Sequence, residues 1–186
     1  MSIYVNGVKE VGNYPEKLTP AVTRWVLPGW YVGGEALSTI SAGNIIYIPI
    51  FVSETTTYTR IGIKVTTLSA GTADLRIFAW NNGLPGALIL NAGTVNTGTA
   101  GLKEIVIAQQ LTRGYYFLAI RCTGTPTMVA PTGLSATVPP VPGINTEGSP
   151  YVSHVLPWVT AAYADPAPAP SGLTQVEYAF VVLREN

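Results

Sequence analysis

The chain has 186 residues, of which 47% are hydrophobic and only 11% are charged, and its ten basic side chains balance ten acidic ones. A soluble domain carries roughly 25% charged residues, and a surface this poor in charge argues against nucleic acid and anionic membranes as partners. A net charge near zero also favours association, so we expect part of the surface to be buried in an oligomer or a larger assembly.

The first 35 residues are interrupted by prolines and show no sustained strand period. Asn6 and Gly7 separate two short apolar stretches and predict a small hairpin, whereas the prolines that follow exclude a long regular element. Aromatic side chains in this segment would not stay in water where a partner surface is available. We therefore predict that residues 1–35 form an arm that packs on another chain. The predicted attachment residues are Ile3, Tyr4, Tyr14, Trp25, Trp30 and Tyr31.

From about Leu37 the sequence becomes a succession of strands. The run Ile45–Val52 is almost continuously apolar, which is typical of a buried strand, and Pro49 within it implies a bulge or an edge position. Ala73–Trp80 alternates between two faces, and the Asn-Asn-Gly sequence after it tolerates the positive φ angles of a tight turn. The strands predicted up to residue 122 are 45–52, 57–67, 73–80, 87–95, 102–109 and 115–122.

A stretch rich in proline, glycine, serine and threonine follows, from Gly124 to Gly172. Within it we predict short strands at 127–130 and 151–159, a loop over 131–150 and polyproline-like chain over 162–170. Gln175–Arg184 then alternates strongly and predicts a closing strand that returns to the sheet after this long connection.

These elements predict an all-β protein, because no segment has the period of an amphipathic helix. We expect an antiparallel β-sandwich of the jelly-roll type over residues 36–186, with residues 131–174 as a Pro-rich connection inside it and residues 1–35 as the N-terminal arm. An immunoglobulin-like sandwich is the alternative, although its strands are usually spaced more regularly.

Side chains suited to catalysis are few. His154 is the single histidine, and the adjacent Ser153 does not make it a catalytic pair, because such pairs meet in space and need a third orienting group. Cys122 is the single cysteine, so neither a disulfide within the chain nor a cysteine metal cluster is expected. No two acidic residues are placed as a pair by a motif. We therefore expect no enzymatic activity, no metal and no cofactor.

The sequence also carries expectations about where the protein is made. Its first residues lack a basic region followed by an apolar one, so we expect no secretory signal. Its longest apolar run is far shorter than the roughly 18–20 residues that a membrane-spanning helix needs. Synthesis in a cytoplasm fits both observations.

Aromatic side chains are the best candidates for binding. Flat rings stack on the apolar face of pyranose sugars while amide side chains bond the hydroxyls, so Trp80, Asn81 and Asn82 at a strand end predict a glycan-binding platform. Trp158 and Tyr163 in the Pro-rich region are further candidates. The alternative in both places is structural, with the rings packed inward or against a neighbouring subunit and the asparagines serving the turn.

The predicted strands also match a known pattern in five segments, which are IIYIPIFV, IGIKVTTLSAGTADLRIFAW, NNGLPGALI, NAGTVNTGTAGLKEIVIAQQL and TRGYYFLAIRC. In these segments the core Ile45–Ala130 resembles a β-sandwich domain that recurs in tailed-phage virion proteins, including tail-fibre, head-fibre and capsid-decoration chains. The middle turn of such domains has the form N/D-x-G-x-P-G, and their late strand opens with a glycine and an aromatic pair, as in Gly114-Tyr115-Tyr116. The resemblance covers somewhat under half of the chain, and related sandwiches also occur as carbohydrate-binding modules.

The resemblance implies a virion building block, made in the cytoplasm of a bacterial host, that forms homotrimers and binds other virion proteins such as a capsid or tail protein. It implies either a decoration or cement protein of the capsid or a projecting fibre, and the fold alone does not choose between them. The alternative function is that of a receptor-binding or carbohydrate-binding domain that recognises host surface glycans.

Overall fold

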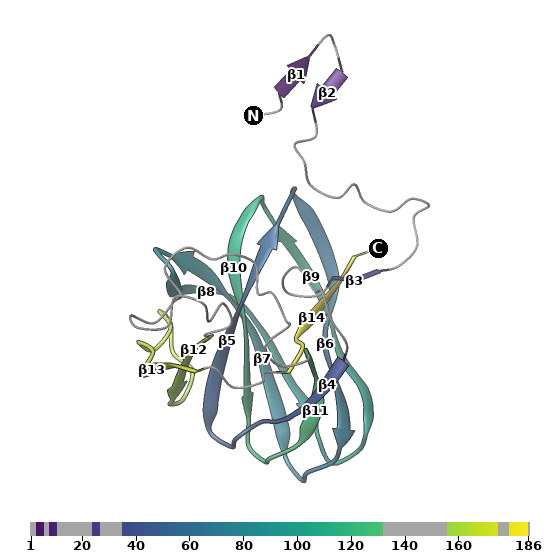
Figure 1. The fold of residues 1–186 in the computed structure, drawn as a ribbon, viewed down its shortest axis with the longest axis vertical. Coiled ribbons are helices and arrows are strands. Elements are labelled where there is room, and N and C mark those ends of the chain that lie inside the picture. The colour runs from purple at the N-terminus through teal and green to yellow at the C-terminus, as the bar shows by residue number, and fades with distance from the viewer. Residues whose placement is uncertain are drawn as a thin grey trace.

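The computed structural model describes residues 3–5, 8–10, 24–26, 35–131, 156–174 and 179–185. Every regular element in these ranges is a β-strand (Figure 1). The strands are β1 (Ile3–Val5), β2 (Val8–Glu10), β3 (Arg24–Val26), β4 (Glu35–Thr39), β5 (Asn44–Val52), β6 (Thr56–Thr67), β7 (Thr72–Asn81), β8 (Leu84–Asn96), β9 (Gly101–Leu111), β10 (Gly114–Cys122), β11 (Thr127–Pro131), β12 (Leu156–Thr160), β13 (Gly172–Thr174) and β14 (Val182–Glu185). The prediction of an all-β protein is confirmed.

The strands from β4 to β11 pair as one long hairpin that is folded over on itself. At its tip β7 pairs with β8, and the antiparallel pairs of β6 with β9, β5 with β10 and β4 with β11 follow toward its open end. The folded hairpin gives two sheets, one in the order β5-β10-β7-β8 and the other in the order β4-β11-β6, with β9 on the other side of β6. This nested pairing is the topology of a jelly roll, which confirms the predicted fold class.

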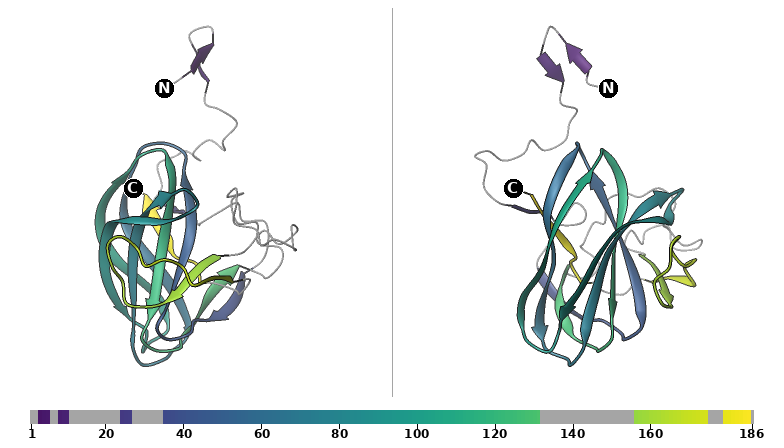
Figure 2. Two further views of the ribbon diagram at one scale, coloured as in Figure 1. Left: turned by 90° about the vertical axis from the view of Figure 1, so that its left-hand side faces the viewer. Right: turned by 180° about the vertical axis from the view of Figure 1, so that it is seen from behind.

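Four of the remaining strands extend the two sheets, β12 and β13 in one and β14 and β3 in the other, whereas β1 and β2 form a separate pair (Figure 2). β14 pairs with β6 and β3 pairs with β14, whereas β1 and β2 pair with each other. β12 lies beside the first residues of β5 and pairs no further than Ile46, so Pro49 has a neighbouring strand on one side only. A residue without an N–H is tolerated at such an edge. The predicted strand over 151–159 is described from Leu156, where β12 begins.

The described part of the predicted closing strand is only partly a strand. Of the predicted closing strand, residues 175–178 lie outside the described residues, and β14 begins only at Val182. Residues 179–181 keep the predicted alternation: Ala179 and Val181 join the core between the sheets, and Phe180 packs against Val129 on the outside. They do not form a strand ladder. A backbone hydrogen bond of 2.9 Å from the Phe180 N–H to the Val129 carbonyl holds this segment in place.

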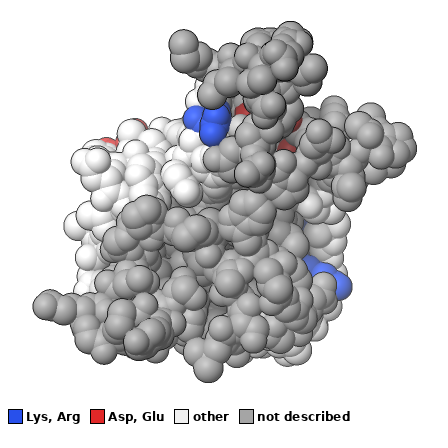
Figure 3. Space-filling view, turned by 45° about the horizontal axis from the view of Figure 1, so that its top comes forward, with Lys and Arg blue, Asp and Glu red and all other residues white. Residues whose placement is uncertain are grey.

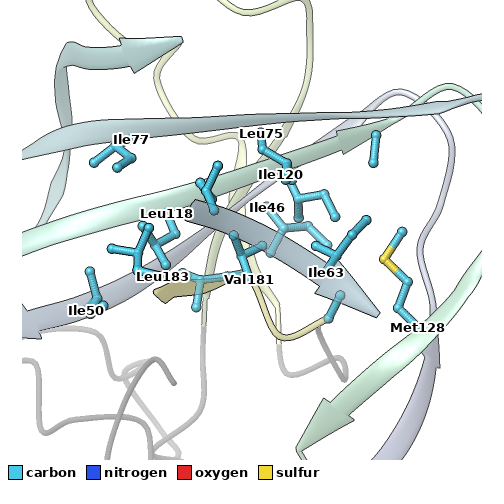
Figure 4. Packing of buried hydrophobic residues seen from close by; sticks show 14 of the residues in the cluster. Ile46, Ile50, Ile63, Leu75, Ile77, Leu118, Ile120, Met128, Val181 and Leu183 are labelled. Atoms are coloured by element: carbon cyan, nitrogen blue, oxygen red, sulfur yellow. The ribbon is translucent and has the colours of Figure 1, made fainter. Parts of the chain in front are cut away.

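The main core lies between the two sheets, where the inward faces of the strands meet (Figure 4). In β6 the predicted alternation directs Ile61, Ile63 and Val65 inward, and all three side chains are buried. Burial of an aliphatic side chain of this size stabilises the fold by about 1.5–3 kcal/mol. The facing sheet contributes Ile46, Ile48, Ile50, Leu75, Ile77, Leu118 and Ile120.

The turn between β7 and β8 is the tight turn that the sequence predicts. Asn82 has a φ of 50° and Gly83 a φ of 90°, and two consecutive positive φ angles are the requirement of a type I′ hairpin turn. The turn keeps the ends of both strands in register, with Trp80 opposite Pro85. It therefore fixes Trp80 at one end of the sheet.

Candidate functional site

The outer face of the β5-β10-β7-β8 sheet carries a row of aromatic rings. Successive residues of a strand point to opposite faces, so in β7 the side chain of Ile77 enters the main core and that of Phe78 points outward. The same alternation in β5 and β10 brings further rings to this face. The members of this aromatic row are Phe51, Tyr115, Trp80, Phe117, Tyr47, Phe78 and Tyr163.

Each ring of the row contacts the next. Phe51 and Tyr115 have ring centroids 4.8 Å apart, and Tyr115 lies 5.2 Å from Trp80. The indole of Trp80 stacks on Phe117 at 5.1 Å with an interplanar angle of 7°. Tyr47 then meets Phe117 edge-on at 6.4 Å. Aromatic pairs of this kind contribute about 0.5–1.5 kcal/mol each beyond the area that they bury, so the rings stabilise one another.

One half of the row is covered by residues 161–171, which we call the strap (Figure 2, left). Tyr163 of the strap stacks on Phe78 at 5.9 Å. The guanidinium of Arg76 lies 4.2 Å from the centre of the Tyr163 ring and pairs with Asp74 through two hydrogen bonds of 3.1 and 3.0 Å. These contacts seal Tyr47, Phe78 and Phe117 completely from solvent, which makes the covered half a second core.

Hydrogen bonds fasten the strap to the sheet, mostly along β8. The Leu88 N–H donates to the Asp165 carboxylate at 2.9 Å, and the Ala167 N–H donates to the Gly86 carbonyl at 2.9 Å. On β10, the Arg121 Nε donates to the Ala161 carbonyl at 2.8 Å. β8 is an edge strand of this sheet, and a covered edge is protected from pairing with other chains.

Two tyrosine hydroxyls lie between the strap and the sheet, and burial raises the pKa of both. The Tyr163 hydroxyl donates to the Asp74 carbonyl at 3.3 Å, and burial, aided by the Asp74 carboxylate, holds the Tyr163 pKa well above its ordinary value. Burial raises the Tyr47 pKa to about 12, and the Tyr47 hydroxyl has no hydrogen-bond partner among the described residues. Both hydroxyls therefore stay protonated at neutral pH.

The other half of the row is more open. Phe51, Tyr115 and Trp80 are half-buried there, and the adjoining turn exposes Asn81 and Asn82. Trp80, which the sequence singled out, therefore belongs to the open half of the row, and the two asparagines follow it at the turn. The sequence did not reveal that Phe51 and Tyr115 complete the surface. The available signal was the alternation in β10, in which Tyr115 and Phe117 lie on the face opposite to Tyr116 and Leu118.

The two candidates from the Pro-rich region lie on different faces. Tyr163 belongs to the covered half of the aromatic row. Trp158 lies opposite Ile46 in the β12–β5 ladder, and Ile46 points into the main core. Directly opposed residues share a face, so Trp158 is on the inner side of the sheet, where its ring packs over Gly172. The structure thus joins Tyr163 and Trp80 in one row and separates Trp158 from both.

Among the predicted attachment residues, Trp25 is the one whose side chain the structure describes. It is half-buried in β3 and packs against Val129, Phe180 and Val182 on the outer face of the β4-β11-β6 sheet. Ile3 and Tyr4 lie in β1, which pairs with β2. The attachment residues Tyr14, Trp30 and Tyr31 lie outside the described residues, as do Ser153 and His154, for which no catalytic role was expected.

Within the described ranges no group of three or more His, Cys, Asp or Glu side chains is placed to hold a metal ion. The same ranges contain no helix with the length and apolarity to span a membrane. Comparison with models of known protein families, with curated proteins and with solved structures finds no match for this chain.

Proposed function

We propose that the chain is a non-enzymatic structural protein of a tailed-phage virion, of the capsid-decoration, cement or fibre type, and that it assembles as a homotrimer with other virion proteins. The observation that carries this proposal is the nested pairing from β4–β11 to β7–β8, because a jelly roll is the fold expected from the resemblance to virion sandwiches. The scarcity of ionisable side chains supports a role in contact and not in catalysis.

The surface supports a role that depends on contact with other proteins. The described atoms visible in Figure 3 are mostly uncharged, with few basic or acidic side chains among them. Burial of apolar surface contributes about 25 cal/mol per Å², so such a protein binds mainly through its apolar groups. The large hydrophobic side chains exposed on the described surface are Leu37, Leu68, Leu84, Leu102 and Val106.

The N-terminal arm is the proposed attachment segment, and Trp25 defines where a deletion should stop. Because Trp25 packs on the sheet, removing residues 1–30 would disturb the sandwich as well as the arm. A deletion of residues 1–20 leaves β3 in place. We expect the shortened chain to unfold at the same temperature as the intact chain and to be lost from phage particles purified on a density gradient. A shortened chain that still copurifies would contradict an attachment role for residues 1–20, and an intact chain absent from particles would contradict the virion role.

Recognition of host glycans is the second candidate function, and the open half of the aromatic row favours it. Trp80 is held by stacking on Phe117, so a sugar that stacks on the indole would not have to immobilise it. Asn81 and Asn82 follow Trp80 in the chain and are exposed, and their amides carry both donors and acceptors for hydroxyl groups. A neutral sugar also suits a surface with few charges.

Trp80→Ala is expected to weaken glycan binding by about tenfold or more, because a tryptophan that becomes covered on binding is typically a dominant contact of an interface. Binding of the intact chain and its variants to a glycan array measures this effect. Trp158→Ala is the matched control, since Trp158 lies on the opposite face of the sheet and its loss should leave the array pattern unchanged. Binding that survives Trp80→Ala would contradict the role of Trp80, and an intact chain that binds no glycan would eliminate this function.

A further inference from the structure

The outer face of the second sheet combines charged side chains with two of the exposed apolar residues named above, Leu102 and Val106. Four strands meet here in the order β9-β6-β14-β3. Val106, Arg60, Arg184 and Trp25 are directly opposed neighbours across them. The residues of this surface, which we call the basic face, are Arg60 and Lys64 of β6, Leu102, Glu104 and Val106 of β9, and Arg184 of β14.

Positive charge exceeds negative charge on the basic face. Glu104 is shared between two arginines, with Arg60 Nε at 3.4 Å from one carboxylate oxygen and Arg184 Nη1 at 3.9 Å from the other. Lys64 is exposed on the same face of β6, two residues beyond Gly62, and lies opposite Leu102 of β9. A single carboxylate thus faces three cationic side chains among the described residues of this face. The buried Nε of Arg184 also has no hydrogen-bond partner in the described part of the chain.

Two apolar side chains flank the shared carboxylate. Val106 is 70% exposed and Leu102 is 52% exposed, and they stand one position to either side of Glu104 on the face of β9. A single exposed aliphatic residue is ordinary, but arginine and tryptophan beside exposed apolar groups are the composition of protein interfaces. The basic face therefore combines apolar area with an unbalanced positive charge.

The arginines are also held in position. Trp25 lies over Gly62 of β6, where a Cβ atom would be 3.2 Å from its ring and 2.8 Å from the Lys103 carbonyl. The guanidinium of Arg184 lies 5.8 Å from the Trp25 ring centre, within the range of a cation–π contact. The Arg60 Nη1 donates to the Thr59 carbonyl at 2.9 Å. Side chains restrained in this way lose little entropy when a partner binds.

We infer that the basic face binds an acidic, leucine- or valine-containing segment of another protein. Carboxylates of that segment meet Arg60, Arg184 and Lys64, and its aliphatic side chains cover Leu102 and Val106. A second copy of the chain is a poorer partner, because in a two-fold contact the same three cations would face one another. Nucleic acid is also a poorer partner, since Glu104 repels phosphate at the centre of the face. This surface is distinct from the aromatic row, and the inference goes beyond the proposed function by naming the chemistry of a partner.

A pair of labelled peptides tests the inference on the full chain by fluorescence anisotropy. One is a short capped peptide rich in glutamate and leucine, and the other has glutamine in place of every glutamate. We expect the acidic peptide alone to bind, and added salt to weaken its binding because exposed charges are screened. Lys64→Gln should weaken binding about two- to fivefold, and Val106→Asn about tenfold. Both side chains are exposed, so neither variant is expected to affect folding.

Arg113→Gln is the matched control, because it removes one positive charge from the turn between β9 and β10, beyond the basic face, and should leave binding unchanged. Equal binding of both peptides, or binding of neither, would overturn the inference. Self-association measured by light scattering that Val106→Asn abolishes, without peptide binding, would assign the face to a second copy instead. Copurification of the intact chain with phage particles tests the proposed function separately, so failure of one is distinguishable from failure of the other.

Discussion

Alkaline solution is expected to unfold the protein before about pH 12, because several buried groups keep their protons in the folded state only. Burial raises the pKa of Tyr47 from 10.0 to about 12 and that of Cys122 from 9.0 to about 12. Burial likewise raises the pKa values of Tyr58 and Tyr163, with further contributions from nearby carboxylates. All four groups therefore resist ionisation in the folded chain.

Rising pH lowers the free energy of unfolding, because these pKa values are higher in the folded chain than in the unfolded chain. Below pH 9 both the folded and the unfolded chain hold all four protons, so the stabilisation is fully present. Above pH 9 for the thiol and pH 10 for the hydroxyls, the unfolded chain releases protons that the folded chain retains. Each group then lowers the free energy of unfolding by about 1.4 kcal/mol per pH unit. A domain is stable by only about 5–15 kcal/mol, so the combined effect of the four groups near pH 12 is comparable with the whole stability of the protein.

Denaturant unfolding followed by circular dichroism at a series of pH values from 8 upward measures this dependence. Tyr47→Phe provides the control, because its hydroxyl has no partner among the described residues and its removal should cost little at pH 8. Between pH 10 and about 12 the free energy of unfolding of the variant should fall less steeply than that of the intact chain, by about 1.4 kcal/mol per pH unit. A free energy of unfolding that stays constant up to pH 11 would contradict the burial of these groups.

The fold could be predicted from the sequence because apolar and polar residues alternate along its strands with a period of two. The alternation of Ile61, Ile63 and Val65 determined the inner face of β6, and Asn82-Gly83 determined the β7–β8 turn. The closing strand was overestimated because alternation in residues 179–181 reflects burial between two layers, and burial on both sides does not require a hydrogen-bonded ladder.

The binding surfaces could be predicted only in part, because they depend on register between distant strands. Trp80 was found as a ring at a strand end, but its neighbours Tyr115 and Phe117 come from another strand, and only their cross-strand positions bring them together. The strap depends on single contacts such as that of Asp165 with Leu88, which no local pattern encodes. The basic face likewise joins side chains from β6, β9 and β14 that lack a common motif.

Phe78→Ala is expected to destabilise the protein by about 3–5 kcal/mol, the usual cost of removing a fully buried phenylalanine. Phe78 is on the outer face of a sheet, where a side chain is ordinarily solvent-exposed, and it is buried because Tyr47 and Tyr163 enclose it at ring distances of 5.6 and 5.9 Å. The large cost therefore depends on the strap. Leu84→Ala at the start of β8 is the exposed control and should cost less than about 1 kcal/mol.

A double-mutant cycle with Tyr163→Ala separates the contribution of the strap from that of the sheet. If Tyr163 seals Phe78, the two substitutions together should cost about 0.5–1.5 kcal/mol less than the sum of their separate costs, since each removes the same ring contact. Denaturant unfolding of the four proteins at neutral pH supplies the values. Additive costs would mean that the strap does not pack on the sheet in solution, and the covered half of the aromatic row would then be as open to ligands as the half that holds Trp80.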